Sequence, residues 1–115
     1  MNVLGEETAT MTVQEAIDTA VRRLVVAANP RKVILFGSHA EGASTPESDV
    51  DLLVIEREVA SKRAEMVRLR KAIGLIGLPV DVLVFSEGEV SDWGHLPGTA
   101  LYWALKEGKV LYEAA

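Results

Sequence analysis

Three aspartates stand in two short apolar segments of this 115-residue chain, and their spacing could gather them at one place. Asp49 and Asp51 are two residues apart at the start of the apolar run Asp49–Ile55. Because side chains alternate across a β-strand, two such carboxylates face the same side, roughly 6–7 Å apart along the backbone. Asp81 lies inside a second apolar run, Val80–Phe85. A carboxylate in such a run needs a partner, and it joins the first two if the two strands pair.

Carboxylates held this close repel one another, and a divalent cation removes that cost. Carboxylate and phosphate oxygens are the ligands that Mg²⁺ prefers. We therefore predict a metal site formed by Asp49, Asp51 and Asp81. A purely structural alternative stays open for each: a loop cap for Asp49, a solvated strand start for Asp51, and a solvent-facing edge position for Asp81.

Gly37 and Ser38 directly follow a further apolar run, Lys32–Phe36, and could bind phosphate. Glycine lets a ligand approach the backbone, while loop amides and the serine hydroxyl can hold an anion. An ordinary strand-to-loop turn is the alternative. A P-loop is excluded, because Ala43 stands where that motif requires lysine.

The elements that must position these residues can be predicted from periodicity and capping signals. We expect a flexible N-terminal tail over residues 1–11 and a single domain over residues 12–115. A capping box of Thr12 and Glu15 begins a helix that ends at Asn29-Pro30. The other expected elements are strands at Lys32–Phe36, Asp49–Ile55, Val80–Phe85 and Lys109–Glu113, helices at Ser61–Ile76 and Thr99–Glu107, a short helix after Ser86, and one helical turn within the loop Gly37–Ser48. This order indicates an α+β fold with a small mixed β-sheet flanked by helices.

Composition excludes several classes of protein. The net charge of −5 argues against direct nucleic-acid binding. The absence of cysteine excludes disulfides and thiolate zinc sites and fits the cytoplasm. No apolar run is long enough to cross a membrane, and the polar start does not resemble a signal peptide. Trp93, Tyr102 and Trp103 are assigned to the core, with a partner contact as the alternative.

The residues that could do chemistry match a known signature as a set. A Gly-Ser pair, ten intervening residues, an Asp-x-Asp pair and a third Asp on a later strand resemble the DNA polymerase β-type nucleotidyltransferase superfamily. The matching positions are Gly37, Ser38, Ser48, Asp49, Asp51 and Asp81, followed by the apolar Leu52–Val54. From Thr12 to Tyr112 the chain resembles the minimal nucleotidyltransferase (MNT) branch, whose members are often the antitoxin of a HEPN/MNT toxin–antitoxin pair.

This resemblance implies a polymerase β-like nucleotidyltransferase core and assigns roles to residues. Asp49 and Asp51 are expected to bind two Mg²⁺ ions, and Asp81 to hold a metal or act as general base. Nucleotide-binding positions are expected at Gly37, Ser38 and Ser48. The implied reaction transfers AMP from ATP to a tyrosine of a HEPN ribonuclease toxin, within a hetero-oligomer of the two proteins. The short chain, without a second substrate-binding domain, fits a protein acceptor.

One position departs from the family pattern and keeps a second function open. Glu41 stands in the run Gly37–Gly42, where the family often has arginine, and a negative charge there is expected to weaken nucleotide binding. His39, Arg63 and Arg68 are candidates to compensate. The alternative is a catalytically weak or inactive module that neutralises the toxin by contact alone. Transfer to an aminoglycoside is a third hypothesis, which would require an added acceptor pocket.

Overall fold

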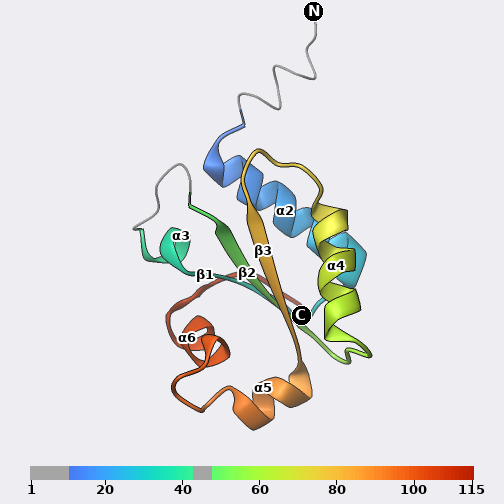
Figure 1. Cartoon of the computed structure of the whole chain (residues 1–115), viewed down its shortest axis with the longest axis vertical. Coiled ribbons are helices and arrows are strands. Elements are labelled where there is room, and N and C mark those ends of the chain that lie inside the picture. Colours follow the sequence, from blue (N-terminus) through green and yellow to red (C-terminus); the bar gives the residue numbers. More distant parts are fainter. Residues whose placement is uncertain (1–10, 43–47) are drawn as a thin grey trace, which may run out of the picture.

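Helix and strand boundaries follow local capping and hydrophobic signals closely. The computed structural model describes residues 11–42 and 48–115. Its elements are α2 (Val13–Ala28), β1 (Lys32–Phe36), α3 (Ser38–Glu41), β2 (Val50–Glu56), α4 (Lys62–Ile73), β3 (Val80–Ser86), α5 (Glu87–Trp93), α6 (Ala100–Glu107) and β4 (Lys109–Glu113) (Figure 1). The expected α+β fold class is confirmed, and so is the predicted order of elements. The predicted tail lies, except for Met11, outside the described residues.

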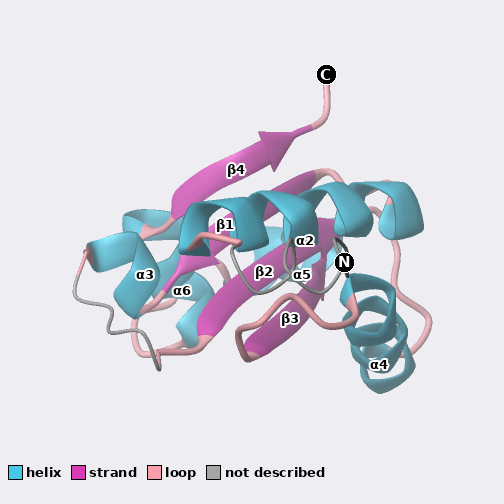
Figure 2. Cartoon of the chain, turned by 90° about the horizontal axis from the view of Figure 1, so that it is seen from above, coloured by secondary structure: helices cyan, strands magenta, loops and turns pink. Residues whose placement is uncertain are grey.

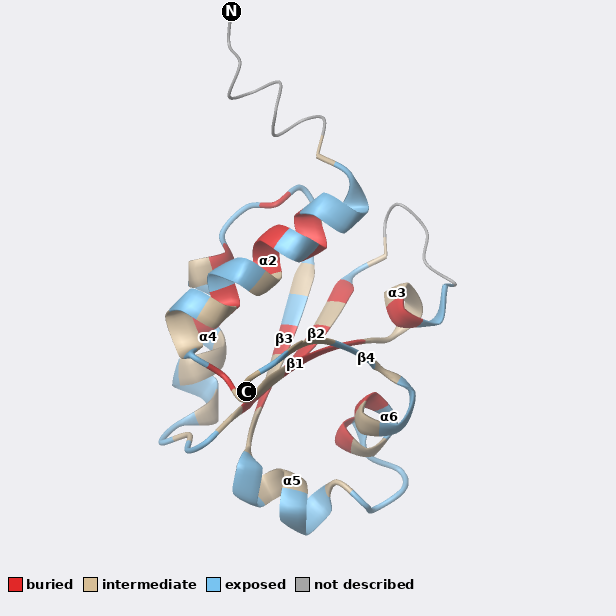
Figure 3. Ribbon diagram, turned by 180° about the vertical axis from the view of Figure 1, so that it is seen from behind, coloured by how far each residue is buried: buried red, intermediate tan, exposed pale blue. Residues whose placement is uncertain are grey.

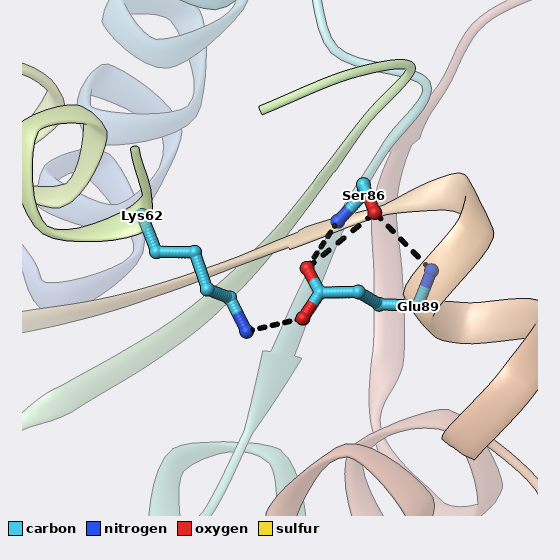
Figure 4. A network of polar contacts seen from close by, with 3 residues as sticks. All are labelled: Lys62, Ser86 and Glu89. Atoms are coloured by element: carbon cyan, nitrogen blue, oxygen red, sulfur yellow. Dashed lines mark hydrogen bonds and ion pairs between the residues drawn. The ribbon is translucent and has the colours of Figure 1, made fainter. Parts of the chain in front are cut away.

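Side-chain caps explain where the helices begin. Thr12 and Glu15 form the predicted capping box of α2, with the Thr12 hydroxyl 3.0 Å from the Glu15 amide and the Thr12 amide 2.9 Å from the Glu15 carboxylate. A second capping box, of Ser86 and Glu89, starts α5. Lys62 at the start of α4 donates to the Glu89 carboxylate at 2.7 Å, which ties α4 to α5 (Figure 4).

The described strands form one four-stranded sheet in the order β3-β2-β1-β4. β1 pairs antiparallel with both β2 and β4, while β2 and β3 are parallel. The β2–β3 register places Asp51 opposite Asp81, and the β1–β2 register places Asp51 opposite Phe36. The sheet is therefore mixed, as predicted.

Two cores lie on opposite faces of the sheet. On one face, α2 and α4 pack against alternate strand residues that include Val33, Leu52 and Val84. On the other face, α5 and α6 cover Ile34, Leu53 and Ile55 (Figures 1 and 3). Because β2 is sandwiched between helices, four consecutive residues, 52–55, are buried. Seen from above, β4 forms one edge of the sheet and β3 the other (Figure 2).

Several element boundaries differ from the sequence prediction by one residue, and the end of α4 differs by three. β2 begins at Val50 and not at Asp49, because its first ladder bond runs from the Val50 amide to Pro79 O, at 2.9 Å. α4 ends at Ile73 and not at Ile76, because Gly74 has a φ of 65°, which breaks the helix. Ile76 is still buried, so the apolar periodicity that suggested a longer helix reflects core packing beyond its end.

No helix within residues 11–42 and 48–115 is long and apolar enough to cross a bilayer.

Candidate active site

Asp51 occupies the centre of the predicted site. It shares strand parity with Leu53 and Ile55, so its side chain lies on the α5/α6 face at the start of β2. Its register partner Asp81 is the second residue of β3 and has the same orientation. The two acidic residues come from segments 30 positions apart in sequence, and the parallel pairing of β2 and β3 brings them side by side.

The surroundings of Asp51 disfavour its negative charge. Burial raises the pKa of Asp51, and the nearby charges of Asp81 and then Asp49 raise it further, while His39 acts in the opposite direction. Asp49 precedes the strand and is exposed, so strand alternation does not orient it as the sequence analysis assumed. Asp49 and Asp81 nevertheless each lie close enough to Asp51 for their charges to raise its pKa.

Gly37 makes room for the Asp51 carboxylate. The end of β1 turns at Gly37 with φ 74° and ψ −158°, a conformation essentially restricted to glycine. A Cβ atom at this position would collide with the Asp51 carboxylate oxygen Oδ2. Two independent constraints, the backbone angle and the contact, therefore require glycine beside the central aspartate.

The short helix α3 connects Gly37 to the rest of the signature segment. The Gly37 carbonyl accepts from the Ala40 and Glu41 amides, at 3.1 and 3.2 Å. Ser38 begins α3 and is partly buried. His39 Nε2 donates to the Ser48 carbonyl at 3.1 Å, so the two ends of the segment 38–48 are held together. Residues 43–47 lie outside the described residues.

The acidic residues suit a hard cation in their chemistry but are not yet gathered around one. Carboxylate oxygens alone match the ligand preference of Mg²⁺, and a cation would offset the charges that oppose ionisation of Asp51. Within residues 11–42 and 48–115, however, no three Asp, Glu or His side chains stand close enough together to hold an ion as placed. The chemistry of the donor set nevertheless fits a divalent metal.

Two of the candidate compensating arginines lie on α4, away from the site. Arg68 donates to Ala27 O and to both oxygens of Glu65, on the face of the sheet covered by α2 and α4. Arg63 lies on the same helix and is exposed. The proposal that they offset Glu41 is therefore wrong, and His39 is the cationic candidate that does lie near Asp51.

A small cavity beside Gly37 was not predicted. It measures about 160 Å³ and lies between the end of β1, α3 and α6, and its walls include Phe36, Ala40, Glu41, Trp103, Ala104 and Glu107. Trp103 is 48% exposed, so its assignment to the core was wrong; Trp93, at 55%, is also exposed. The helical period could have located Trp103 outside, because it lies off the buried stripe formed by Leu101, Ala104 and Leu105.

Comparisons with known proteins agree on the type of domain. The sequence model of the nucleotidyltransferase domain family matches residues 15–106. Among solved structures, the spectinomycin adenyltransferase AAD(9) from Enterococcus faecialis, with ATP and spectinomycin, superposes with a TM-score of 0.64 at 20% identity. The match covers 90% of this chain and 57% of that one, a likeness of fold.

A candidate nucleotidyltransferase from Sulfolobus solfataricus matches with a TM-score of 0.45 and 25% identity, over 84% of this chain and 94% of that one. Among curated protein sequences, no match was found.

Proposed function

This chain belongs to the nucleotidyltransferase domain family, and from that premise we propose that it transfers AMP from ATP, with Mg²⁺, to a tyrosine of a HEPN-type toxin and thereby acts as its antitoxin. One observation carries the catalytic part of the proposal: Asp51 and Asp81 are register partners at the start of two parallel strands, beside Gly37. The protein acceptor rests on the resemblance of the chain from Thr12 to Tyr112 to the MNT branch.

The chemistry requires an acceptor oxygen in line with the α-phosphate and the departure of pyrophosphate. Asp49 and Asp51 would hold the metal, which supplies charge neutralisation at the phosphates when bound. Asp81 is exposed beside Asp51, where its carboxylate can accept the proton from the tyrosine hydroxyl. The oxygen–phosphorus bond to tyrosine forms as the bond to pyrophosphate breaks. Gly37, Ser38 and Ser48 would position the triphosphate.

A transfer assay tests this function directly. The purified chain is incubated with Mg²⁺, the product of the neighbouring gene, and ATP labelled at either the α- or the γ-phosphate. We expect label on the partner from α-labelled ATP alone, lost on addition of EDTA and in Asp51→Asn. Asp92→Asn, an exposed carboxylate of α5 outside the site, is the matched control and should retain activity.

If no label from α-labelled ATP appears on the partner, the proposed transfer of AMP to a protein is refuted. Spectinomycin, offered as acceptor in the same assay, tests the small-molecule hypothesis. Label on spectinomycin and none on the partner would show that the acceptor is a small molecule and not a protein.

A contact-only antitoxin is the second candidate, and Glu41 favours it. Its exposed carboxylate lies on the rim of the cavity beside Gly37, where it repels phosphate. The test is the growth of cells that express the toxin together with the Asp51→Asn variant of this chain. It distinguishes neutralisation by AMP transfer from neutralisation by contact alone. Full protection by this variant would show that contact is sufficient, whereas loss of protection with the complex still formed would show that transfer is needed.

A further inference from the structure

The cavity beside Gly37 has a chemistry that the proposed reaction does not use. Its floor is apolar, formed by Phe36, Ala40 and Ala104. Its lining also includes Trp103, Glu41 and Glu107, which are exposed. The two glutamates are exposed, and neither carboxylate makes a hydrogen bond or an ion pair within the part of the chain that the structure describes. The cavity thus combines an aromatic residue with two carboxylates that form no ion pair among the described residues.

Size and charge both argue against a nucleotide in this cavity. Pockets for drug-sized ligands usually measure about 300–1,000 Å³, and this one, at about 160 Å³, suits a single side chain. A triphosphate would also be repelled by two carboxylates in the absence of a neutralising cation. The nucleotide is therefore expected on the Asp51 side of Gly37, and the cavity remains for another group.

A cationic side chain matches all three parts of the cavity. Its alkyl stem would pack on the apolar floor, its charge would pair with the carboxylates, and a planar guanidinium can stack on an indole face. The aromatic surface already attracts a cation, since the Lys106 ammonium lies 5.6 Å from the centroids of both Tyr102 and Trp103. Those two rings stack edge to face, 5.1 Å apart, which holds the indole in place.

We propose that this cavity is an acceptor subsite, which binds an arginine side chain of the protein that is modified and so places its hydroxyl near Asp81. The acceptor role of this subsite rests on the proposed function. Binding of the arginine side chain itself requires neither nucleotide nor metal. Glu41, at the position where related sequences carry arginine, then acts as a specificity residue for the acceptor.

A fluorescence titration tests the subsite without reference to transfer. Trp93→Phe leaves Trp103 as the single tryptophan of the chain. The probe is a six-residue arginine peptide, compared with the citrulline peptide, which has nearly the same shape without the charge. In the Trp93→Phe background we expect a saturable change in Trp103 emission with the arginine peptide only, and affinity about tenfold weaker in Glu41→Gln/Glu107→Gln.

A matched double variant separates the subsite from general charge attraction. Asp18→Asn/Glu58→Gln removes the same two charges from exposed positions on α2 and on the loop before α4, and it should bind the arginine peptide as the parent does. Equal weakening in both double variants would overturn the proposal, as would equal binding of the citrulline peptide.

Two further ligands identify any other occupant. ATP should neither change Trp103 emission nor compete with the arginine peptide; competition would assign the cavity to the adenine base and overturn the proposal. Spermidine binding as tightly as the peptide would assign it to a small free cation, with the same consequence. Failure of the transfer assay alone leaves this titration intact, and failure of the titration leaves transfer intact, so the two hypotheses can be refuted separately.

Discussion

At the scale of the residue, the site is organised around Asp51. Its carboxylate is partly buried, lies against Gly37, and is flanked by the charges of Asp81 and Asp49. The burial and the two neighbouring charges raise the pKa of Asp51 and so oppose its ionisation. Carboxylates held close together repel one another and lower the stability of the fold. Functional sites commonly carry such a cost, because the same groups are needed to bind a ligand.

Replacing Asp51 by Asn should therefore stabilise the fold while abolishing transfer. The neutral amide removes the repulsion by Asp81 and Asp49, which we expect to raise the free energy of unfolding by on the order of 0.5 kcal/mol in buffer with EDTA. Urea unfolding of the two chains measures this difference. A loss of stability would mean that the carboxylate makes favourable contacts beyond those described.

Replacing Gly37 by Ala should have the opposite effect on stability. The new Cβ atom would meet the Asp51 carboxylate, and alanine would be forced into a glycine-only conformation at a cost of about 1–3 kcal/mol. Thermal unfolding gives the magnitude. Gly42→Ala is the control for a positive φ without a clash: that glycine has φ 73° and ψ 13°, a left-handed conformation that alanine reaches at lower cost, and nothing lies within 4 Å of its added Cβ, so the variant should lose less stability than Gly37→Ala.

At the scale of the element, the two faces of the sheet have different roles. The α2/α4 face contains the larger hydrophobic core, which supports the strands on the side opposite the candidate site. The α5/α6 face carries Asp51, the second residue of β2. Arg23 on α2 donates to the Ile73 carbonyl, which links α2 to the end of α4 behind the sheet.

Leu69 on α4 is fully buried in that supporting core, so truncation should weaken the whole fold. We expect Leu69→Ala to lower the free energy of unfolding by about 2–5 kcal/mol, through lost apolar contact and the cavity left behind. Val67→Ala, on the same helix but 48% exposed, should cost much less. Chemical denaturation of both variants provides the measurement; equal losses would contradict the assignment of α4's buried face.

At the scale of the whole molecule, the far end of β2 carries a second acidic cluster unrelated to the site. Glu56 is hydrogen-bonded to Glu65, which also accepts two bonds from Arg68. Burial, then the hydrogen bond and the charge of Glu65, raise the pKa of Glu56 to about 7. The Glu56 Oε2 atom is buried without a hydrogen-bond partner among the described residues. The folded chain therefore keeps a proton on Glu56 near neutral pH.

This proton makes stability depend on pH in a defined direction. The unfolded chain releases it near pH 4.5 and the folded chain only near pH 7, so the contribution of Glu56 is complete below pH 4.5 and is lost as pH rises to about 7. Glu56→Gln should flatten this slope and stabilise the chain at pH 8 by on the order of 1 kcal/mol, after allowance for partial exposure.

Melting temperatures of Glu56→Gln and the parent chain between pH 5 and 8 measure the effect, with exposed Glu58→Gln as control. Parallel curves for the parent chain and Glu56→Gln would contradict the assignment.

The sequence alone determined the elements and the identity of the family. Capping residues such as Thr12 and Thr99 and short apolar runs such as Lys32–Phe36 specify helices and strands through interactions between near neighbours, which are written in the chain itself. The spacing from Gly37 to Asp51 likewise required no coordinates to indicate nucleotidyl transfer.

Only the tertiary structure decided which side chains meet. The parallel pairing of β2 with β3 places Asp81 opposite Asp51, and the packing of α6 beside α3 creates the cavity of Trp103 and Glu41. The packing of α4 with α2 places Arg63 and Arg68 on the opposite face of the sheet. These outcomes depend on contacts between residues far apart in sequence, and no local signal encodes which of the compatible pairings buries the most apolar surface.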